Sequence, residues 1–173
     1  MKIHRKLVYL VAFFSVGFTV SAQEDLKKRA TAEEIAAKQE TKEYKKKLNN
    51  LTKGMATTSS GLQYKVTEKT EGVQAKNGDI VKVQYTGKLV GGIKFDSSLD
   101  REQPLSLLLG VGMVIKGWDE GIALLKVGEK ATFVIPGDLA YAEGGSGVLI
   151  GPNETLVFDV ELVEIAATEP FDT

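Results

Sequence analysis

Cysteine is absent from this chain of 173 residues, and its only histidine, His4, stands close to the N-terminus. Without cysteine there is no disulfide and no cysteine nucleophile, and a zinc site built from His and Cys ligands is excluded. A Ser-His-Asp triad would have to use His4. These absences remove most nucleophilic and metal-dependent chemistry, so we expect neither a metal nor another cofactor. Stability must come from a hydrophobic core, which a chain of this length can form.

The chain also lacks an excess of charge of either sign. Its 22 Lys and Arg residues against 23 Asp and Glu residues give a net charge of −1. Proteins that bind nucleic acid usually carry a clustered basic surface, and this balance of charges does not indicate one. Nucleic acid is therefore not expected among the partners of this protein.

No apolar run reaches the roughly 20 residues that a membrane-spanning helix needs. The longest uncharged and mostly apolar run, Leu7–Val20, has 14 residues and follows a basic start. With small residues at Ala22 and before it, residues 1–22 have the three-part pattern of a secretory signal peptide. We predict cleavage near Ala22, an exported protein of the periplasm, and no stable membrane span after cleavage. The processed chain would lose His4 and carry 19 basic against 23 acidic residues, a net charge of −4.

Residues 23–54 form a polar helical extension that is rich in Ala, Lys and Glu and contains no proline. Thr31 and Glu34 match a capping box, and Gly54 stands where a left-handed helix C-cap is expected, so we predict a helix over 31–53. Two interpretations remain open: a dimerisation or docking helix, and a solvated spacer that is partly disordered. The apolar positions of the predicted helix form a narrow stripe, namely Ala37, Tyr44, Leu48 and Leu51.

After a short linker, 55–58, the periodicity of the sequence changes from helical to extended. Val81, Val83 and Tyr85 alternate with polar residues, which is typical of a half-buried strand. Similar patterns predict strands over 62–68, 94–96, 105–109, 131–135 and 156–162.

A single helix is expected among these strands, because Trp118, Ile122 and Leu125 recur at the spacing of one helix face. We therefore predict an α+β fold, in which a twisted antiparallel sheet of about five strands wraps around one short helix. The domain is expected over 59–166 and is followed by a tail, 167–173. The N-terminal helix precedes this domain.

Four segments of this domain resemble FKBP-type peptidyl-prolyl cis/trans isomerases, and a fifth, Ser60–Tyr64, is similar to the entry into such domains in bacterial members. Together with the signal peptide pattern and the helical extension, this resemblance implies an exported bacterial type. Val83–Ser98 is similar to the family's Tyr-Thr-Gly strand and the Phe-Asp-Ser-Ser bulge after it. Val114–Gly121 resembles the Val-Ile turn and the helix that places a tryptophan at the pocket floor. Pro136–Ala142 resembles the segment that ends in the pocket tyrosine, and Thr155–Leu162 resembles the closing strand. The resemblance covers about residues 59–165.

The resemblance implies an enzyme that accelerates the isomerisation of X-Pro bonds in an aromatic cleft while exported proteins fold. The implied partners are proline-containing unfolded or partly folded chains, and macrolide inhibitors are implied as ligands. An alternative is a peptide-binding chaperone module with little turnover, dimeric through the 31–53 helix. The implied catalytic residues are Tyr85, Phe95, Asp96 and Tyr141. The implied substrate-binding residues are Arg101, Leu105, Val114, Ile115, Trp118, Ile150 and Phe158.

Three positions depart from the family pattern. Leu105 stands where an aromatic residue is usual, Ala142 replaces a glycine after the pocket tyrosine, and Gly151 replaces a proline. These differences are expected to change substrate preference and inhibitor affinity more than the reaction itself.

Overall fold

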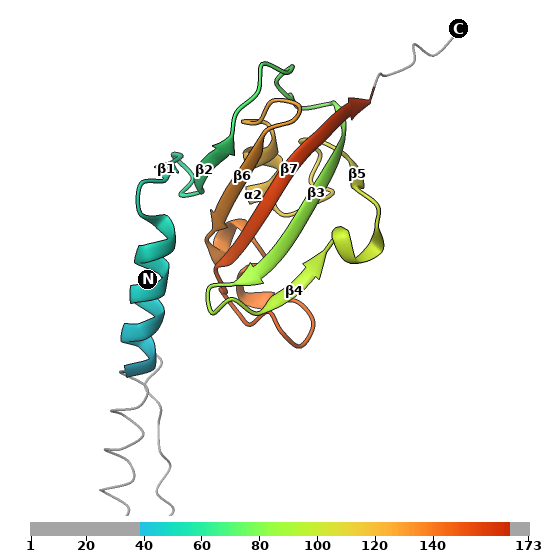
Figure 1. The fold of residues 1–173 in the computed structure, drawn as a ribbon. Coiled ribbons are helices and arrows are strands. Elements are labelled where there is room, and N and C mark those ends of the chain that lie inside the picture. The colour runs from blue at the N-terminus through green and yellow to red at the C-terminus, as the bar shows by residue number, and fades with distance from the viewer. Residues whose placement is uncertain (1–38, 167–173) are drawn as a thin grey trace, which may run out of the picture. The chain divides into compact units, whose positions relative to one another are not determined.

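The computed structural model describes residues 39–166 (Figure 1). The predicted signal peptide, 1–22, the start of the predicted N-terminal helix and the tail, 167–173, lie outside the described residues. Contacts divide the chain into two units, 1–41 and 42–173. None of the helices in the described part is both long and apolar enough to cross a membrane.

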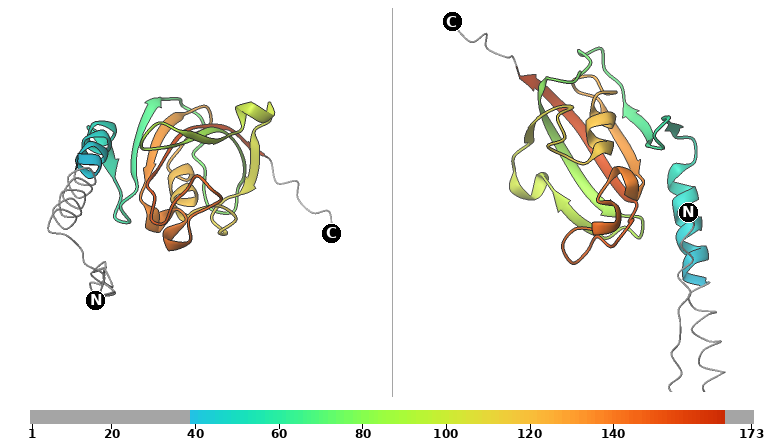
Figure 2. Two further views of the ribbon diagram at one scale, coloured as in Figure 1. Left: turned by 90° about the horizontal axis from the view of Figure 1, so that it is seen from below. Right: turned by 180° about the vertical axis from the view of Figure 1, so that it is seen from behind.

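A seven-stranded antiparallel sheet organises the second unit, and it wraps around one short α-helix, α2 (Lys116–Ile122) (Figures 1 and 2). The strand order is β1-β2-β6-β7-β3-β4, and β5 pairs with β3. This arrangement confirms the predicted α+β architecture. The strands are β1 (Ala56–Thr57), β2 (Gln63–Glu68), β3 (Ile80–Leu89), β4 (Lys94–Ser97), β5 (Leu105–Leu108), β6 (Lys130–Ile135) and β7 (Leu156–Ala166).

The strand count differs from the expected five because one edge strand is interrupted. On one side, β7 pairs with the whole of β3. On the other side, β4 pairs with the end of β3 and β5 pairs with its beginning, and a short 3-10 helix, η1 (Leu99–Arg101), lies between them in the chain. The remaining strand, β1, falls in the predicted linker 55–58, where its two residues pair with Tyr64 and Gln63.

The inner face of the sheet and α2 form the main core. Trp118 and Ile122 of α2 are buried, as are the inward residues of β6 and β7. Two glycines let the helix approach the sheet closely. A Cβ at Gly117 would lie 2.5 Å from Ile135 Cγ2, and one at Gly121 would lie 2.8 Å from the Phe133 ring. This close packing fixes the position of Trp118 under the sheet.

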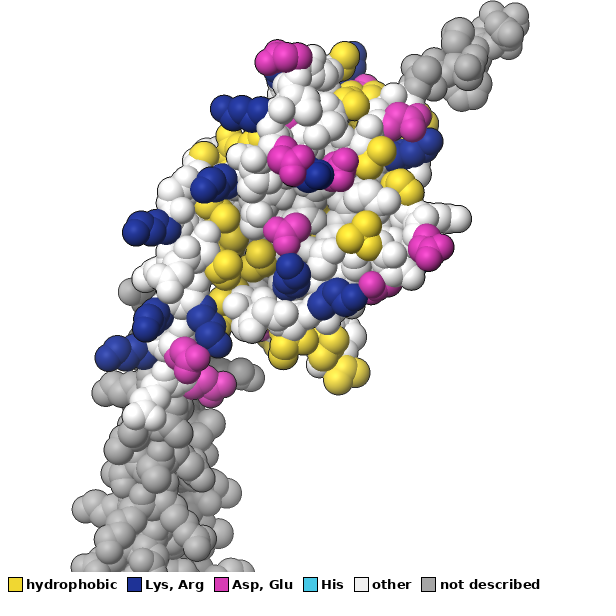
Figure 3. Space-filling view, viewed as in Figure 1, with side chains coloured by type: hydrophobic (Ala, Val, Ile, Leu, Met, Phe, Trp, Pro, Cys, Tyr) yellow, Lys and Arg dark blue, Asp and Glu magenta, His cyan; other side chains and the backbone are white. Residues whose placement is uncertain are grey.

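The outer face of the sheet carries charged side chains of both signs (Figure 3). Ion pairs connect neighbouring strands there, and each is largely solvent-exposed, so each contributes little stability. They are Lys82–Glu164 at 3.0 Å, Lys88–Asp159 at 2.9 Å and Lys130–Glu68 at 3.0 Å.

The described part of the N-terminal helix covers residues 39–52. The hydroxyl of Thr52 donates to the Leu48 carbonyl at 3.0 Å, and the Met55 N–H donates to the Thr52 carbonyl at 3.0 Å. Gly54 has φ +75°, the left-handed conformation that was expected at this helix end. The first predicted residues of the helix, including Ala37, lie outside the described residues.

A second apolar cluster lies on the outer face of the sheet. Val90, Val134 and Val157 are buried there, each no more than 6% exposed. The side chains that pack against them are half-buried ones from the N-terminal segment: Tyr44, Leu48 and Met55. Two residues of the predicted apolar stripe therefore contact the chain's own sheet.

Candidate functional site

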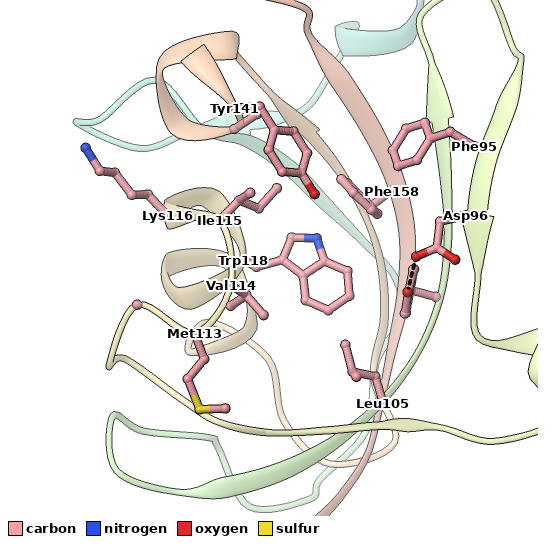
Figure 4. A pocket seen from close by; sticks show the side chains of 13 residues that line it. Phe95, Asp96, Leu105, Met113, Val114, Ile115, Lys116, Trp118, Tyr141 and Phe158 are labelled. Carbon is pink, nitrogen blue, oxygen red and sulfur yellow. Dashed lines mark hydrogen bonds between the residues drawn. The ribbon is translucent and has the colours of Figure 1, made fainter. Parts of the chain in front are cut away.

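A cavity of about 570 Å³ opens between α2, the inner face of the sheet and the loops around them (Figure 4). Its volume is in the range of small-molecule and peptide pockets. Of the eleven predicted site residues, all but Arg101 and Ile150 line this cavity. Its lining comprises Tyr85, Phe95, Asp96, Leu105, Gly112, Met113, Val114, Ile115, Lys116, Trp118, Ala140, Tyr141 and Phe158.

Four aromatic rings form a tightly packed wall in this cavity. The centroids of Tyr85 and Trp118 lie 4.8 Å apart, those of Trp118 and Phe158 5.2 Å, and those of Phe95 and Phe158 5.5 Å. Each of these pairs is edge-to-face, which is a favourable geometry for aromatic quadrupoles. The buried indole Nε1 of Trp118 has no hydrogen-bond partner among the described residues. The wall offers a rigid apolar surface for a small ring.

The Ser97-Ser98 pair fixes the position of Tyr85 beside this wall. The Tyr85 N–H donates to Ser98 Oγ at 2.8 Å, and Ser97 Oγ donates to the Tyr85 carbonyl at 2.9 Å. The Ser98 N–H also donates to that carbonyl at 3.1 Å. Because both serines are buried, their hydrogen bonds are protected from water. The end of β4 and the residue after it therefore hold Tyr85 and the neighbouring Asp96 in a defined geometry.

The loop before α2 supplies the opposite side of the cavity. The N–H groups of Gly110 and Gly112 donate to the two carboxylate oxygens of Asp119, each at 2.9 Å. Ile115 is the last residue before α2, and its carbonyl accepts from the Trp118 N–H at 2.9 Å. The Ile115 N–H has no partner within residues 39–166, so it is available to a ligand carbonyl.

Arg101 lies behind the cavity and connects two residues of its wall. Its Nη1 lies 2.6 Å from Asp96 Oδ1 in an ion pair, and its Nη2 donates to Tyr85 Oη at 2.6 Å. Tyr85 Oη in turn donates to Asp96 Oδ2. The guanidinium therefore orients both the carboxylate and the phenol.

This network moves two pKa values in opposite directions. Burial alone would raise the pKa of Asp96, but the hydrogen bonds from Tyr85 and Arg101, together with the Arg101 charge, outweigh it and lower that pKa. Burial raises the pKa of Tyr85, and its hydrogen bond to the Asp96 carboxylate raises it further. Asp96 is therefore ionised and Tyr85 neutral throughout the physiological range.

We expect the activity of this site to be independent of pH between about pH 5.5 and 9. The lowered pKa of Asp96 stabilises the fold above the unfolded-state pKa, and this stabilisation is lost only as pH falls through the folded pKa in the acidic range. The raised pKa of Tyr85 stabilises the fold below about pH 10, and this is lost as pH rises through the folded pKa. Measuring kcat/KM against pH tests this, and a sigmoidal step inside the range would show that another titrating group takes part.

Tyr141 and Ile150 lie on the outer side of the cavity. Tyr141 is 40% exposed and lies between two 3-10 helices, η2 (Gly137–Leu139) and η3 (Ala142–Gly144). Ile150 is buried and lines a smaller cavity of about 270 Å³ that shares Phe95, Asp96 and Tyr141 with the main one. Ile150 therefore belongs to an adjoining hollow under the flap, residues 143–152, rather than to the main cavity.

The departures from the family pattern have visible consequences. Leu105 occupies one end of the cavity, where its aliphatic side chain leaves that wall without a ring (Figure 4). Ala142 adopts φ +48°, a left-handed conformation that favours glycine, which explains why glycine is usual there. Its carbonyl accepts from the Asn153 N–H at 2.7 Å, and this bond helps hold the strained residue. At Gly151, a Cβ would meet only the end of the Glu154 side chain, at 3.8 Å.

Four lining residues were not predicted from the sequence: Gly112, Met113, Lys116 and Ala140. Three of them flank the predicted Val114-Ile115 pair, and the fourth directly precedes Tyr141. Adjacency to these positions was the only available signal, since neither their residue types nor their spacing indicates a pocket.

Comparison with known proteins identifies the family. The family profile described as FKBP-type peptidyl-prolyl cis-trans isomerase matches residues 71–163, more than half of the chain. The chain belongs to this family. The match contains β3 to β6 and most of β7, and therefore every residue that lines the cavity.

Individual relatives agree with this assignment. Over 123 residues the chain is 53% identical to the "Probable FKBP-type peptidyl-prolyl cis-trans isomerase FkpA" of Neisseria meningitidis, covering 71% of this chain but only 44% of that protein. It is 58% identical over 90 residues to "FK506-binding protein 1" of Saccharomyces cerevisiae, covering 52% of this chain and 79% of that protein. The chain thus spans less than half the length of the meningococcal relative.

A solved structure shows the same fold. The crystal structure of FkpA from Escherichia coli superimposes with a TM-score of 0.65 at 42% identity, covering 86% of this chain and 66% of that chain. The FKBP-type domain of the present chain is therefore similar to solved members in both sequence and architecture.

Proposed function

We propose that this protein is an exported peptidyl-prolyl cis/trans isomerase that acts on X-Pro bonds of unfolded or partly folded chains. The observation that carries the proposal is the aromatic cavity, in which Tyr85, Phe95, Trp118 and Phe158 surround a space suited to a proline ring. Membership of the FKBP-type family supports the same reaction.

The chemistry of isomerisation requires no nucleophile. Resonance gives the peptide C–N bond a rotation barrier of about 18–20 kcal/mol, and X-Pro bonds exchange over about 10–100 s. No covalent bond is made or broken, so the enzyme only has to favour the twisted amide over the planar one. An acceleration of 10⁴ needs about 5–6 kcal/mol of differential stabilisation.

Desolvation is the first proposed source of this stabilisation. The planar amide is more polar than the twisted one, because twisting removes the charge separation that resonance creates. An aromatic cavity withdraws water from the amide, so it destabilises the planar form more than the twisted form. Trp118 and Phe158, which are 3% and 4% exposed, would provide the dry floor and wall.

Fixed polar groups at the rim would hold the substrate chain while the bond rotates. The free Ile115 N–H would donate to a substrate carbonyl, and Tyr141 Oη would bond the substrate backbone from the outer side. Asp96, held by Arg101 and Tyr85, would place a fixed negative charge near the rotating imide. Such preorganised groups need no rearrangement during the reaction.

The purified protein is expected to accelerate cis/trans exchange of a short X-Pro peptide in catalytic amounts. Exchange is followed by NMR or by a conformer-specific protease. Phe95→Ala is expected to lower kcat/KM at least tenfold, because it removes one wall of the cavity. The matched control is Tyr64→Ala, which removes a half-buried aromatic side chain of β2 away from the cavity. No acceleration at micromolar enzyme would exclude the proposed activity.

Export and periplasmic location are the second part of the proposal, and the pattern of residues 1–22 supports them. A peptide-binding chaperone module with little turnover is the alternative function. It is favoured by the exposed apolar residues Val111, Met113 and Val148, which are 54%, 66% and 102% exposed. Suppression of aggregation that persists in Phe95→Ala would support this alternative.

A further inference from the structure

Met113 is an apolar residue that lines the cavity without belonging to the core. The two residues after it, Val114 and Ile115, are partly buried against the main core. Met113 itself is 66% exposed and lies outside the core clusters of the described residues. Water therefore contacts most of its side chain. An apolar side chain in this state gains free energy when an apolar ligand group covers it.

The backbone around Met113 is held in place. On one side, the N–H groups of Gly110 and Gly112 donate to the two carboxylate oxygens of Asp119, each at 2.9 Å. On the other side, α2 begins three residues after Met113. These contacts fix the point from which the side chain extends. The thioether chain beyond that point has three rotatable bonds and adapts readily to the shape of what it contacts.

The proposed reaction determines which part of a substrate would lie near Met113. During isomerisation the carbonyl before the proline rotates, while the proline ring stays in the aromatic cavity. A donor that holds the chain throughout has to bond a carbonyl that does not rotate. The free Ile115 N–H would therefore donate to the carbonyl of the proline itself. The residue after the proline would then pass along the segment that contains Met113 and Ile115.

The arrangement of the lining agrees with this direction. In Figure 4, Met113 and Leu105 lie on the same side of Trp118. Tyr141 lies on the opposite side of that indole. A substrate bonded at one end by Tyr141 and held at its proline by Ile115 would leave the cavity at the end where Met113 and Leu105 lie. Both of these side chains line the cavity, and both are aliphatic.

We propose that Met113, together with Leu105, forms a subsite for an apolar side chain on the residue that follows the proline. This inference rests on the proposed function, because it concerns the substrate chain that would occupy the same cavity. Substrates with an apolar residue after the proline would bind more tightly and react faster than those with a polar residue of the same size. The contact would cover the exposed thioether and the substrate side chain together.

The expected preference follows from the apolar area that the contact covers. A leucine side chain that is about half covered gains roughly half the free energy of full burial, which corresponds to a factor of about 3 to 10. A peptide with Leu after the proline should therefore have a kcat/KM about 3- to 10-fold above that of the Asn peptide, whose side chain has nearly the same shape. This ratio should persist when salt is raised from about 20 mM to about 0.5 M, since salt screens charges and not apolar contacts.

The experiment uses the purified protein and peptides that differ only in having Leu or Asn after the proline. For each variant the Leu-to-Asn ratio of kcat/KM is recorded, so that a general change in activity cancels. Met113→Gln should lower this ratio by at least about twofold, because it replaces the thioether with a polar amide of similar length. Met113→Leu should keep the ratio close to that of wild type, because the side chain stays apolar.

Val111→Gln is the matched control. Val111 belongs to the same loop and is 54% exposed, but it does not line the cavity. Its replacement should leave the Leu-to-Asn ratio unchanged. The same exchange of Leu for Asn before the proline gives a second control, because the ratio at that position should not differ between wild type and Met113→Gln.

Binding of the same peptides, followed by the fluorescence of Trp118, the only tryptophan, gives a Leu-to-Asn ratio of Kd that requires no turnover. Peptides that bind without being accelerated would contradict the isomerase function, but the Kd ratios of wild type and Met113→Gln would still decide the role of Met113. The inference is overturned if wild type shows no preference for Leu after the proline or if Met113→Gln keeps that preference. An equal loss in Val111→Gln would also overturn it.

Discussion

Replacing Gly87 with alanine is expected to lower kcat/KM for X-Pro isomerisation by about two orders of magnitude while the protein remains folded. Gly87 is a buried residue of β3 and lies behind the aromatic wall rather than in the cavity lining. A Cβ built there would lie 2.7 Å from the Phe158 ring and 2.7 Å from the Phe95 ring. Both rings line the cavity, so the added methyl group would displace side chains of the site itself.

The size of the effect follows from these distances. Carbon atoms in contact are usually about 3.5–4.0 Å apart, so the two rings would have to move by roughly 1 Å. Displacements of this order can reduce catalysis about 10²-fold. Overpacking of this kind lowers the free energy of unfolding by about 1–3 kcal/mol, which many domains tolerate.

Gly91→Ala provides the control, since Gly91 lies in the turn between β3 and β4 and a Cβ there would have no atom within 4 Å. Its activity and stability should remain close to those of wild type. Urea unfolding of both variants gives the fraction of each protein that is folded. The values of kcat/KM are then compared per folded molecule. A folded Gly87→Ala variant with activity within threefold of wild type would show that the packing of Phe95 and Phe158 does not control the reaction.

The aromatic part of the site was predictable from the sequence because its residues belong to contiguous motifs. Tyr85 follows the alternation of β3, and Trp118 follows the helical spacing of α2. The resemblance to the FKBP-type family added Phe95, Phe158 and the roles of all four. Local periodicity and local motifs therefore specify which side chains face the cavity.

Features that depend on side-chain bonds between distant segments were not predictable in this way. Ser60, which stands 60 residues before Glu120 in the chain, donates a hydrogen bond to that carboxylate. The Asp119 carboxylate likewise accepts the N–H groups of Gly110 and Gly112, which lie outside α2. The interruption of the edge strand by η1 was also not evident, because β4 and β5 have separate apolar patterns.

The outer apolar cluster is a feature of the fold that was likewise not predictable from the sequence. The stripe that contains Tyr44 and Leu48 was recognised from its spacing, but its partner was not. Val134 and Val157 are directly paired on β6 and β7, on the face opposite to the predicted core residues. A single outward valine on a strand is common, and only the sheet brings these two and Val90 together.

Replacing Tyr44 and Leu48 together with alanine is expected to lower the free energy of unfolding by about 2–3 kcal/mol. Both side chains are half-buried against the outer cluster, so their removal exposes Val90, Val134 and Val157. The aromatic cavity lies on the other face of the sheet, so kcat/KM of the folded variant for the proposed reaction should change little. Urea denaturation with an unchanged m-value measures the loss.

Leu51→Ala is the matched control, because Leu51 belongs to the same stripe but is 37% exposed and outside the cluster. It should change the free energy of unfolding by less than about 0.5 kcal/mol. Light scattering on the same variants separates this intramolecular packing from the hypothesis of a dimer through the 31–53 helix. If the stripe were a dimer seam, the measured mass of the double variant would be half that of wild type. The stability of wild type would then depend on protein concentration, whereas that of the double variant would not. A stability loss at constant monomer mass would instead make residues 42–55 a fixed part of the folded domain.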